Sequence, residues 1–491
     1  GSLLYDTRSI VTNYDLVATT QNRAIKVAYN YAGKYFIEGA ANVSGYNRYN
    51  PDKQNGLFYA GGLGWQMAEE SFIKDNVSWI NAWKWRATYG RTGNNTVDRY
   101  SYYGFRQTYG SSLDDYRVGN AHGQIFVQVE DALANPHMEW EKANKFDFGT
   151  DISLFNNHFQ VTADYYRDNY FDILLQRGRS IALIGTSYPV ENIGKALYHG
   201  GELTLTYQGN AGNFNYFISG NASIQASKWV FRDELQSPAP GMRLTGRPVG
   251  TIFGYEALGF YNDAQDVADN GHLVSGIAKG PQAGDIKYKD QLTIDTDGDG
   301  VADKADGLID QFDVVPIGNN KPLVFYGTSF GFNYNGFSLS VILQGVLNRN
   351  INVNNALNNG FQGTNFGFGI PLQPYGQAYE NILNRWTPET AATASTPRLS
   401  LGNQYNIQTS SFWIKSGNYF RVKNVEVGYE LPYNWVKSLH VAGVRVFVNG
   451  QNLYTLGGYK GMDPEVYPSN FGGNYPYFIQ RVINTGVSVK L

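Results

Sequence analysis

The last stretch of the sequence, residues 417–491, contains three segments in which apolar and polar residues alternate. Alternation with a period of two is the pattern of a β-strand with two unlike faces. An apolar face suits the core side of a soluble sandwich or the lipid side of a membrane sheet, so this pattern leaves both architectures open. The apolar positions are Val425, Val427, Tyr429 and Leu431, then Val444, Val446 and Val448, then Ile483, Val487, Val489 and Leu491.

The same pattern recurs earlier in the chain as pairs of strands joined by short turns. The predicted pairs are 25–31 with 35–43, 146–154 with 159–165, 203–207 with 214–224, and 324–334 with 337–347. Far longer connections separate them, about fifty residues after Gly90 and about ninety after Lys228. Outer-membrane barrels have short periplasmic turns and long extracellular loops, an asymmetry that a sandwich does not require. The pattern therefore favours an all-β fold, a transmembrane antiparallel β-barrel portion of roughly 14 strands.

The composition fits this prediction without proving it. Aromatic residues make up 15% of the 491 residues, with 37 Tyr, 28 Phe and 9 Trp. Tyr and Trp gather at the two rims of membrane barrels, although an aromatic-rich carbohydrate-binding β protein would have a similar composition. The net charge of −3 gives no reason to expect nucleic acid as a partner. No apolar run approaches the ~18 residues of a transmembrane helix, and the absence of Cys excludes disulfides.

One acidic segment has the spacing of a calcium-binding loop. Such a loop takes oxygen ligands from positions 1, 3, 5, 9 and 12, a main-chain carbonyl from position 7, and a Gly at position 6. The corresponding residues are Asp295, Asp297, Asp299, Asp303 and Asp306, with the Val301 carbonyl and Gly300. We therefore expect a structural Ca²⁺ ion here. Because Asp306 is shorter than the usual Glu, Asp310 or Asp313 is an alternative ligand or part of a second site.

No motif in the sequence indicates an enzyme. The six His residues, at positions 122, 137, 158, 199, 272 and 440, do not have metal-ligand spacing. Neighbouring carboxylates such as Asp114-Asp115 and Glu69-Glu70 would point to opposite faces of a strand, which argues against a glycosidase pair. The sequence also lacks a phosphate-binding Gly-Lys-Ser/Thr loop.

Seven stretches, in order along the chain, resemble the SusC/RagA-type TonB-dependent outer-membrane transporters of Bacteroidetes. They are 89–94 (YGRTGN), 135–142 (NPHMEWEK), 284–290 (GDIKYKD), 385–389 (RWTPE), 419–424 with 427–432 (YFRVKN and VGYELP), 449–453 (NGQNL) and 459–465 (YKGMDPE). The resemblance implies a nutrient importer for oligosaccharides or peptides in the outer membrane. Its implied partners are a SusD-like surface lipoprotein and the TonB–ExbB–ExbD complex.

The resembling stretches run from about Trp85 to Leu491, and the resemblance implies that residues 1–491 are only the C-terminal part of such a transporter's barrel. It implies that the plug domain and the first barrel strands belong to another part of the protein or to a separate polypeptide, because an open set of strands must be closed in a membrane. Two other functions remain open. One is a SusC-like structural subunit of an outer-membrane assembly or secretion complex, and the other is a soluble Ca²⁺-stabilised protein that binds or hydrolyses carbohydrate.

Overall fold

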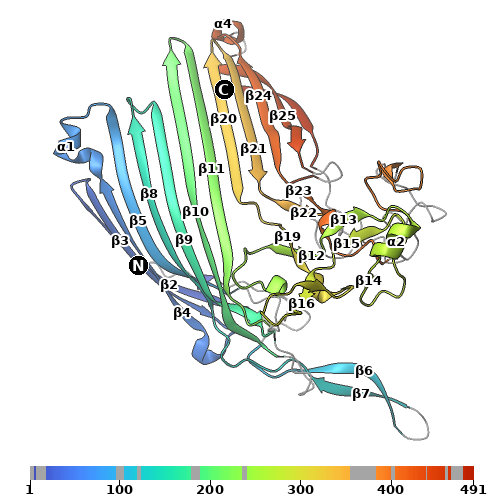
Figure 1. The fold of residues 1–491 in the computed structure, drawn as a ribbon. Coiled ribbons are helices and arrows are strands. Elements are labelled where there is room, and N and C mark those ends of the chain that lie inside the picture. The colour runs from blue at the N-terminus through green and yellow to red at the C-terminus, as the bar shows by residue number, and fades with distance from the viewer. Residues whose placement is uncertain are drawn as a thin grey trace. The chain divides into compact units, whose positions relative to one another are not determined.

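The computed structural model describes residues 5–6, 18–95, 104–118, 123–178, 188–234, 240–353, 383–399, 404–437, 440–458, 463–465 and 479–491. The chain divides into two compact units. The first comprises Gly1–Gly209, Asn221–Gln236 and Leu244–Arg247, and the second comprises Asn210–Gly220, Ser237–Arg243 and Pro248–Leu491. Long β-strands make up most of both units (Figure 1). None of the described helices has the length and hydropathy needed to cross a bilayer.

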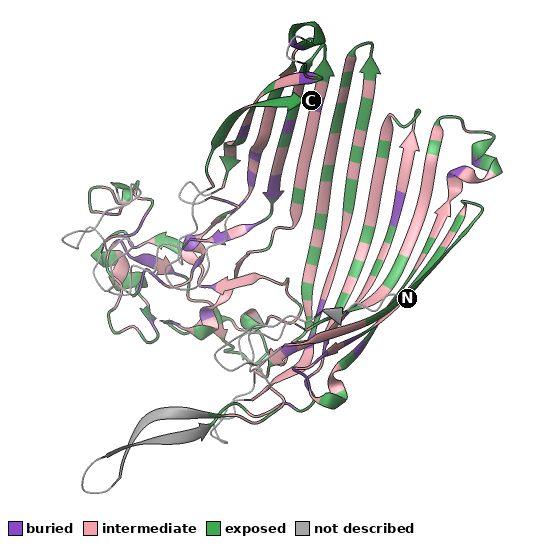
Figure 2. Cartoon of the chain, turned by 180° about the vertical axis from the view of Figure 1, so that it is seen from behind, coloured by how far each residue is buried: buried purple, intermediate pink, exposed green. Residues whose placement is uncertain are grey.

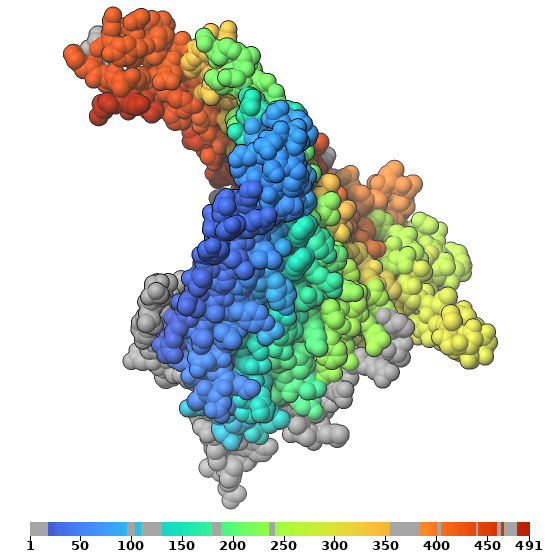
Figure 3. Space-filling model, turned by 90° about the vertical axis from the view of Figure 1, so that its left-hand side faces the viewer, coloured from blue at the N-terminus to red at the C-terminus, as the bar shows by residue number. Residues whose placement is uncertain are grey.

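The strands of the first unit follow one another in chain order, as β1-β2-β3-β4-β5-β8-β9-β10-β11. Neighbouring strands from β2 to β10 pair in antiparallel fashion, and β6 and β7 form a separate hairpin in the connection from β5 to β8. Side chains of β2 to β5 lie against one another in the blue part of the space-filling view (Figure 3). The bounds are β1 Tyr5–Asp6, β2 Thr20–Tyr31, β3 Tyr35–Tyr46, β4 Asn55–Gln66, β5 Ile80–Asn94, β6 Tyr109–Val118, β7 Gly123–Glu130, β8 Glu141–Leu154, β9 Phe159–Gln176, β10 Val190–Ala211 and β11 Phe214–Phe231.

The second unit continues the same order through β11-β20-β21-β24-β25-β26, so the principal sheet has fourteen strands. This agrees with the roughly 14 strands predicted from the sequence. The bounds are β20 Val324–Tyr334, β21 Phe337–Leu347, β24 Tyr419–Glu430, β25 Gly443–Gly457 and β26 Val482–Lys490. The antiparallel pairing of β20 to β26 is regular except around residue 423 of β24, where the register shifts both against β21, between Ile342 and Leu343, and against β25, between Val422 and Asn424.

Short turns and long connections alternate along the sheet, as predicted. The turn from β20 to β21 consists of Asn335 and Gly336, whose φ angles of 47° and 88° match the left-handed backbone that a two-residue hairpin requires. At the opposite strand ends, the connections from β11 to β20 and from β21 to β24 are long and contain further structure. The expected loop of about ninety residues after Lys228 is therefore not a plain loop.

Residues 248–320, 350–353, 383–399 and 404–416 form what we call the loop module. It is built from short paired strands around a buried core of Tyr261, Val274, Ile286, Tyr288, Ile309, Ile351, Val353, Tyr405 and Trp413. Its strands are β12 Thr251–Gly254, β13 Ala257–Phe260, β14 Leu273–Val274, β15 Ile286–Tyr288, β16 Leu292–Ile294, β17 Lys304–Ala305, β18 Leu308–Ile309, β19 Val315–Asn319, β22 Asn350–Asn352 and β23 Ile414–Ser416. The helices among the described residues are α1 Ser71–Lys74, α2 Ala264–Asn270 and α4 Tyr433–Val436, with 3₁₀ turns at Pro51–Lys53, Met67–Glu69, Pro240–Met242, Gln311–Asp313 and Ser411–Trp413.

The two faces of the principal sheet differ in polarity. On one face of the second unit, Val427 pairs with Val448, and both side chains are exposed. On the other face, Arg445 donates to Glu426 at 2.8 Å and Asn449 donates to Asn424 at 2.9 Å. Buried residues are few along the long strands in Figure 2. A sheet that leaves its apolar face exposed is suited to contact with lipid on that face.

The first unit repeats this arrangement. On its apolar face Ile37 pairs with Leu63, and both are exposed. On its polar face the Arg86 guanidinium lies 2.9 Å from Asp151, 2.7 Å from Asp164 and 3.6 Å from Asp147. A second hydrophobic cluster packs at the long-connection end of this unit, and consists of Tyr46, Tyr49, Phe58, Met138, Trp140 and Leu174.

The difference between the two faces can be tested by substitution at one depth in the sheet. In the complete protein, Val427→Arg places a charge on the apolar face and should lower the free energy of unfolding by about 2–4 kcal/mol if the site lies near the bilayer midplane. Ser340→Arg is the matched control, because Ser340 lies on the polar face opposite Glu426, the residue next to Val427. Unfolding is measured on protein reconstituted in lipid vesicles, from the shift in gel mobility between the folded and the unfolded barrel. Equal losses for the two variants would contradict a lipid-facing Val427.

Candidate functional site

The acidic segment found in the sequence forms the tip of a hairpin. Strand β16 pairs with β17 through Leu292 opposite Ala305 and Ile294 opposite Lys304, and the Asp303 amide donates to the Ile294 carbonyl at 2.8 Å. Residues 295–303 are therefore the tip of this hairpin, and residues 290–291 and 306–307 lie at its base. The short ladder separates these two ends.

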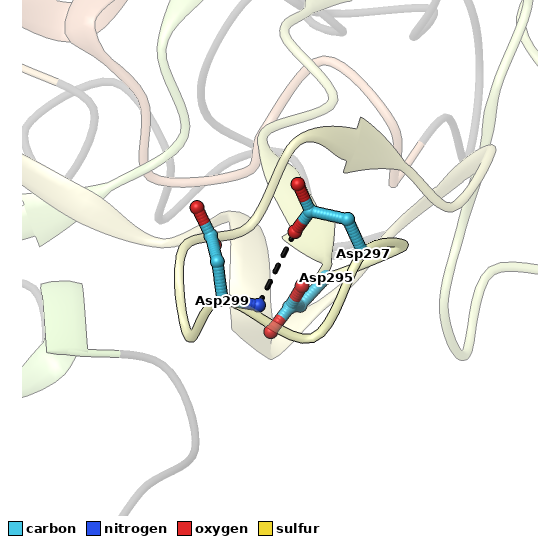
Figure 4. A group of neighbouring side chains, drawn as sticks. All are labelled: Asp295, Asp297 and Asp299. Atoms are coloured by element: carbon cyan, nitrogen blue, oxygen red, sulfur yellow. Dashed lines mark hydrogen bonds between the residues drawn. The ribbon is translucent and has the colours of Figure 1, made fainter.

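Asp295, Asp297 and Asp299 come together at the hairpin tip (Figure 4). One carboxylate oxygen from each of them lies within 4.8 Å of the others, and no other such group of three acidic or His side chains occurs among the residues that the structure describes. Each carboxylate also accepts a backbone N–H of the tip, for example from Gly298 to Asp295 at 2.7 Å and from Val301 to Asp299 at 2.7 Å. These bonds fold the tip into a tight turn.

The remaining predicted ligands are not in this group. Asp303 accepts from the backbone N–H of Thr296 at 3.1 Å and from its hydroxyl at 2.5 Å. The ligand predicted from Val301 is its main-chain carbonyl, which is not part of this group of side chains. Asp306 lies at the base, opposite Gln291, as the pairing of Leu292 with Ala305 requires. It is thus four strand positions from Asp295, or roughly 13 Å along the ladder. The tip by itself offers Asp295, Asp297 and Asp299.

The electrostatics of the tip favour charged carboxylates. Backbone N–H groups of Gly300 and Gly298 lower the pKa of Asp295, and the hydroxyl and N–H of Thr296 lower the pKa of Asp303. Neighbouring charged carboxylates repel one another unless a cation binds. Ca²⁺ prefers carboxylate and carbonyl oxygens, so the tip fits the expected ion in ligand type.

The base of the hairpin holds two carboxylates that are nearly or wholly buried, Asp290 and Asp313. Asp313 has no exposed surface, and it accepts the backbone N–H of Gln291 at 2.6 Å and of Asp310 at 2.8 Å. Burial raises the pKa of Asp313, and the charges of Asp290 and Asp306 raise it further. The sequence analysis gave Asp290 no role, because it lies outside the loop spacing and at the end of the GDIKYKD stretch.

The loop module is held together by a buried ion pair. The Asp285 side chain is almost fully buried, and Arg398 donates to it at 2.7 Å while Asn406 donates at 2.9 Å. The preceding Gly284 has a φ of +84°, and a Cβ there would lie 2.3 Å from the Trp386 ring. Two stretches that are far apart in the sequence, 284–290 and 385–389, are therefore packed together.

A second buried network, which we call the DPE clamp, joins residues 463–465 to β24. The Arg421 side chain is only 2% exposed, and its Nη2 atom donates to both carboxylate oxygens of Asp463, at 2.9 and 2.8 Å. Its Nη1 atom lies 2.9 Å from Glu465, which also pairs with Lys423 at 2.9 Å. The clamp holds the end of a motif whose first residues, 459–462, lie outside the described residues.

The polar face of the second unit contains an open cavity of about 270 Å³ near the short turns. Arg445 lines it together with Glu430 and Ser338, and Asn213, Asn215 and Asn333 supply amide groups. Arg445 is already paired with Glu426, and Asn449 with Asn424. The cavity is lined by amide, hydroxyl and charged groups that can form hydrogen bonds.

Ca²⁺ at the tip remains a prediction, and chelation tests it. In the complete protein, removal of Ca²⁺ should increase protease cleavage within residues 295–303, because repulsion between the carboxylates is then uncompensated. Asp297→Asn should weaken the protection that added Ca²⁺ gives, whereas Asp269→Asn, an exposed change in α2, should leave it intact. Cleavage that is the same with and without Ca²⁺ would argue against an ion at the tip.

The DPE clamp predicts a large effect at Arg421 and a small one at Lys423. Arg421→Leu leaves Asp463 and Glu465 without their buried partner and should cost about 3–5 kcal/mol, seen as faster hydrogen exchange at residues 463–465. Lys423→Ala removes a partly exposed pair and should cost about 0–1 kcal/mol. If both variants exchange alike, the clamp does not depend on buried charge.

Comparison with known proteins identifies the family and the fold of the chain. Residues 4–276 match the family described as "TonB dependent receptor-like, beta-barrel". TonB-dependent receptor P3 of Formosa agariphila is 28% identical over 453 residues, which is 90% of this chain and 41% of the relative. TonB-dependent receptor SusC of Bacteroides thetaiotaomicron is 23% identical, over 92% of this chain and 42% of the relative.

Solved structures give the same result. The structure of the RagAB peptide transporter superposes with a TM-score of 0.70 at 19% identity, over 96% of this chain and 48% of that chain. The chain thus spans less than half the length of the relatives and structures that it matches. Its fold is that of a β-barrel portion, and the matched family is one of receptors rather than enzymes. Because the family match covers more than half of the sequence, we conclude that this chain belongs to the TonB-dependent receptor β-barrel family of outer-membrane proteins.

Proposed function

We propose that this chain is part of an active nutrient importer of the outer membrane. The importer takes up oligosaccharides or peptides, works with a SusD-like surface lipoprotein, and draws energy from TonB–ExbB–ExbD. Support for the SusC-like branch comes from the SusC relative, and support for peptides comes from the structures described as the RagAB peptide transporter.

The observation that carries the proposal is the folded loop module at the long-connection end of the strands. Its core of nine buried residues and the Asp285–Arg398 pair make it an ordered structure. Binding sites are commonly placed on loops that a rigid scaffold positions. A module of this kind suits the recognition of a bulky ligand and the docking of a partner protein better than a simple diffusion pore.

The polar face of the sheet also supports passage of hydrophilic cargo. Arg86 and its three Asp partners, and Arg445 with Glu426, place charged groups along that face. Charged groups on a membrane-spanning sheet face water or protein, because lipid would not solvate them. The proposal therefore places the cargo on this face and lipid on the other.

An uptake experiment tests the proposal. Cells that lack the complete protein should lose accumulation of one class in a panel of labelled oligosaccharides and peptides, and the restored gene should recover it. A protonophore should abolish the recovered uptake if TonB supplies the energy. Purification of the complete protein in mild detergent should bring down a SusD-like lipoprotein.

Two results would contradict the importer. One is unchanged accumulation of every labelled compound in the deletion strain. The other is recovery of the purified protein with barrel-assembly or secretion components and without a lipoprotein partner, which would favour a structural subunit. A protein that leaves the membrane fraction without detergent would contradict both functions.

A further inference from the structure

The base of the β16–β17 hairpin contains a buried carboxylate with an unsatisfied oxygen. The Asp290 side chain is 6% exposed, and its Oδ2 atom accepts the backbone N–H of Gly307 at 2.7 Å. Its buried Oδ1 atom has no hydrogen-bond partner among the described residues. A buried carboxylate is costly unless it is paired with a cation or fully hydrogen-bonded. Asp290 therefore needs a further partner.

Two more carboxylates lie at the same place. Asp306 precedes Gly307, the residue that donates to Asp290, and Asp313 accepts the N–H of Gln291, the residue that follows Asp290. The His272 imidazole lies next to Asp290. Its Nδ1 atom is 3.8 Å from Asp290 Oδ2 and 3.1 Å from the Gly307 carbonyl oxygen. Even a protonated His272 would supply one positive charge against three carboxylates.

The spacing around Gly307 is the second half of a calcium loop. Asp306, Asp310 and Asp313 correspond to ligand positions 5, 9 and 12, with Gly307 at position 6 and the Leu308 carbonyl at position 7. Gly307 has a φ of +87°, as a sharp turn requires. Position 1 of the same loop has no carboxylate in this stretch, and Asp290 lies at the base in the connection between β15 and β16.

The turn is fixed by the core of the loop module. Strand β14 pairs with β18 in parallel, with Val274 opposite Ile309, and Ile309 is fully buried. The Ser275 amide also donates to the Ile309 carbonyl at 2.8 Å. The backbone between Asp306 and Asp310 is therefore held in place independently of the exposed hairpin tip.

We propose that Asp290, Asp306 and Asp313 bind one divalent cation, Ca²⁺ by ligand type, at the base of the hairpin. This site is separate from the exposed tip group of Asp295, Asp297 and Asp299. The three base carboxylates do not all lie within 4.8 Å of one another, so binding requires the exposed Asp306 side chain to turn toward the two buried ones. The inference does not depend on the cargo or on transport.

Calcium binding to the complete protein tests the proposal. The protein is purified in mild detergent, stripped with a chelator and equilibrated with radioactive Ca²⁺, and the number of bound ions and their Kd are measured. Asp290→Asn and Asp306→Asn should each remove the same ion or weaken it at least roughly tenfold. Asp297→Asn is the matched control at the tip, and it should leave that ion in place.

The outcomes separate the base from its alternatives. Unchanged Ca²⁺ binding in both Asp290→Asn and Asp306→Asn overturns the proposal, and so does loss of all binding in Asp297→Asn, which would place the only ion at the tip. If Asp290→Asn fails to fold, Asp306→Asn decides, because that side chain is exposed. Loss of folding in His272→Gln with no Ca²⁺ effect in any variant would make the imidazolium the partner of Asp290. Ion binding is measured without transport, so a failed uptake experiment leaves this test intact.

Discussion

Backbone hydrogen bonding in a medium without water is the constraint on which the rest of the structure depends. The inner strands of the principal sheet pair their N–H and C=O groups with a neighbour on each side, as β21 does with β20 and β24, and β25 with β24 and β26. Once the ladder is fixed, the period of two assigns each side chain to one face. Val427 and Val448 then meet lipid, and Glu426 and Arg445 meet the polar interior. The principal sheet needs no packed core of its own.

Packed cores occur where the chain leaves the principal sheet. The loop module surrounds Tyr288, Tyr405 and Trp413, and a separate cluster surrounds Tyr49 and Trp140. Charges are buried at the same places, in the Asp285–Arg398 pair and the DPE clamp. Buried ion pairs contribute little net stability, but breaking one is costly, so they favour one arrangement of the loops over its alternatives.

The sequence predicts the principal sheet better than the loops, for a physical reason. Alternation identifies a strand while its register is regular, so the hairpin at Asn335-Gly336 is predicted correctly. Strand β10 begins at Val190 rather than near Leu203, because the register shifts around Gly194 interrupt the period of two. The shift in β24 beyond Val422 likewise hides that Arg421 faces Asp463, about forty residues away in the sequence. A long-range pair of this kind leaves no local pattern.

The acidic segment illustrates the same limit at a functional site. The structure brings Asp295, Asp297 and Asp299 together in a tight turn with Gly298 and Gly300, so this part of the predicted ligand set is local in the sequence. The spacing does not reveal the hairpin ladder, since β16 and β17 have three and two residues, too few for a visible period. That ladder moves Asp306 away from the tip and toward Asp290.

The position of the base carboxylates links charge to the order of the loop module. Gly307 donates to Asp290, and two residues later Ile309 is packed in the module core. Repulsion among uncompensated carboxylates would push the 306–310 turn away from Asp290 and would strain the β14–β18 pairing that buries Ile309. A cation at the base would attract all three carboxylates, so the repulsion between them would be replaced by attraction to the ion. The carboxylates would then hold the turn against the core. The tip group lies beyond the ladder and has no such link to the core, which is why the two ends of one short hairpin should respond differently to the same ion.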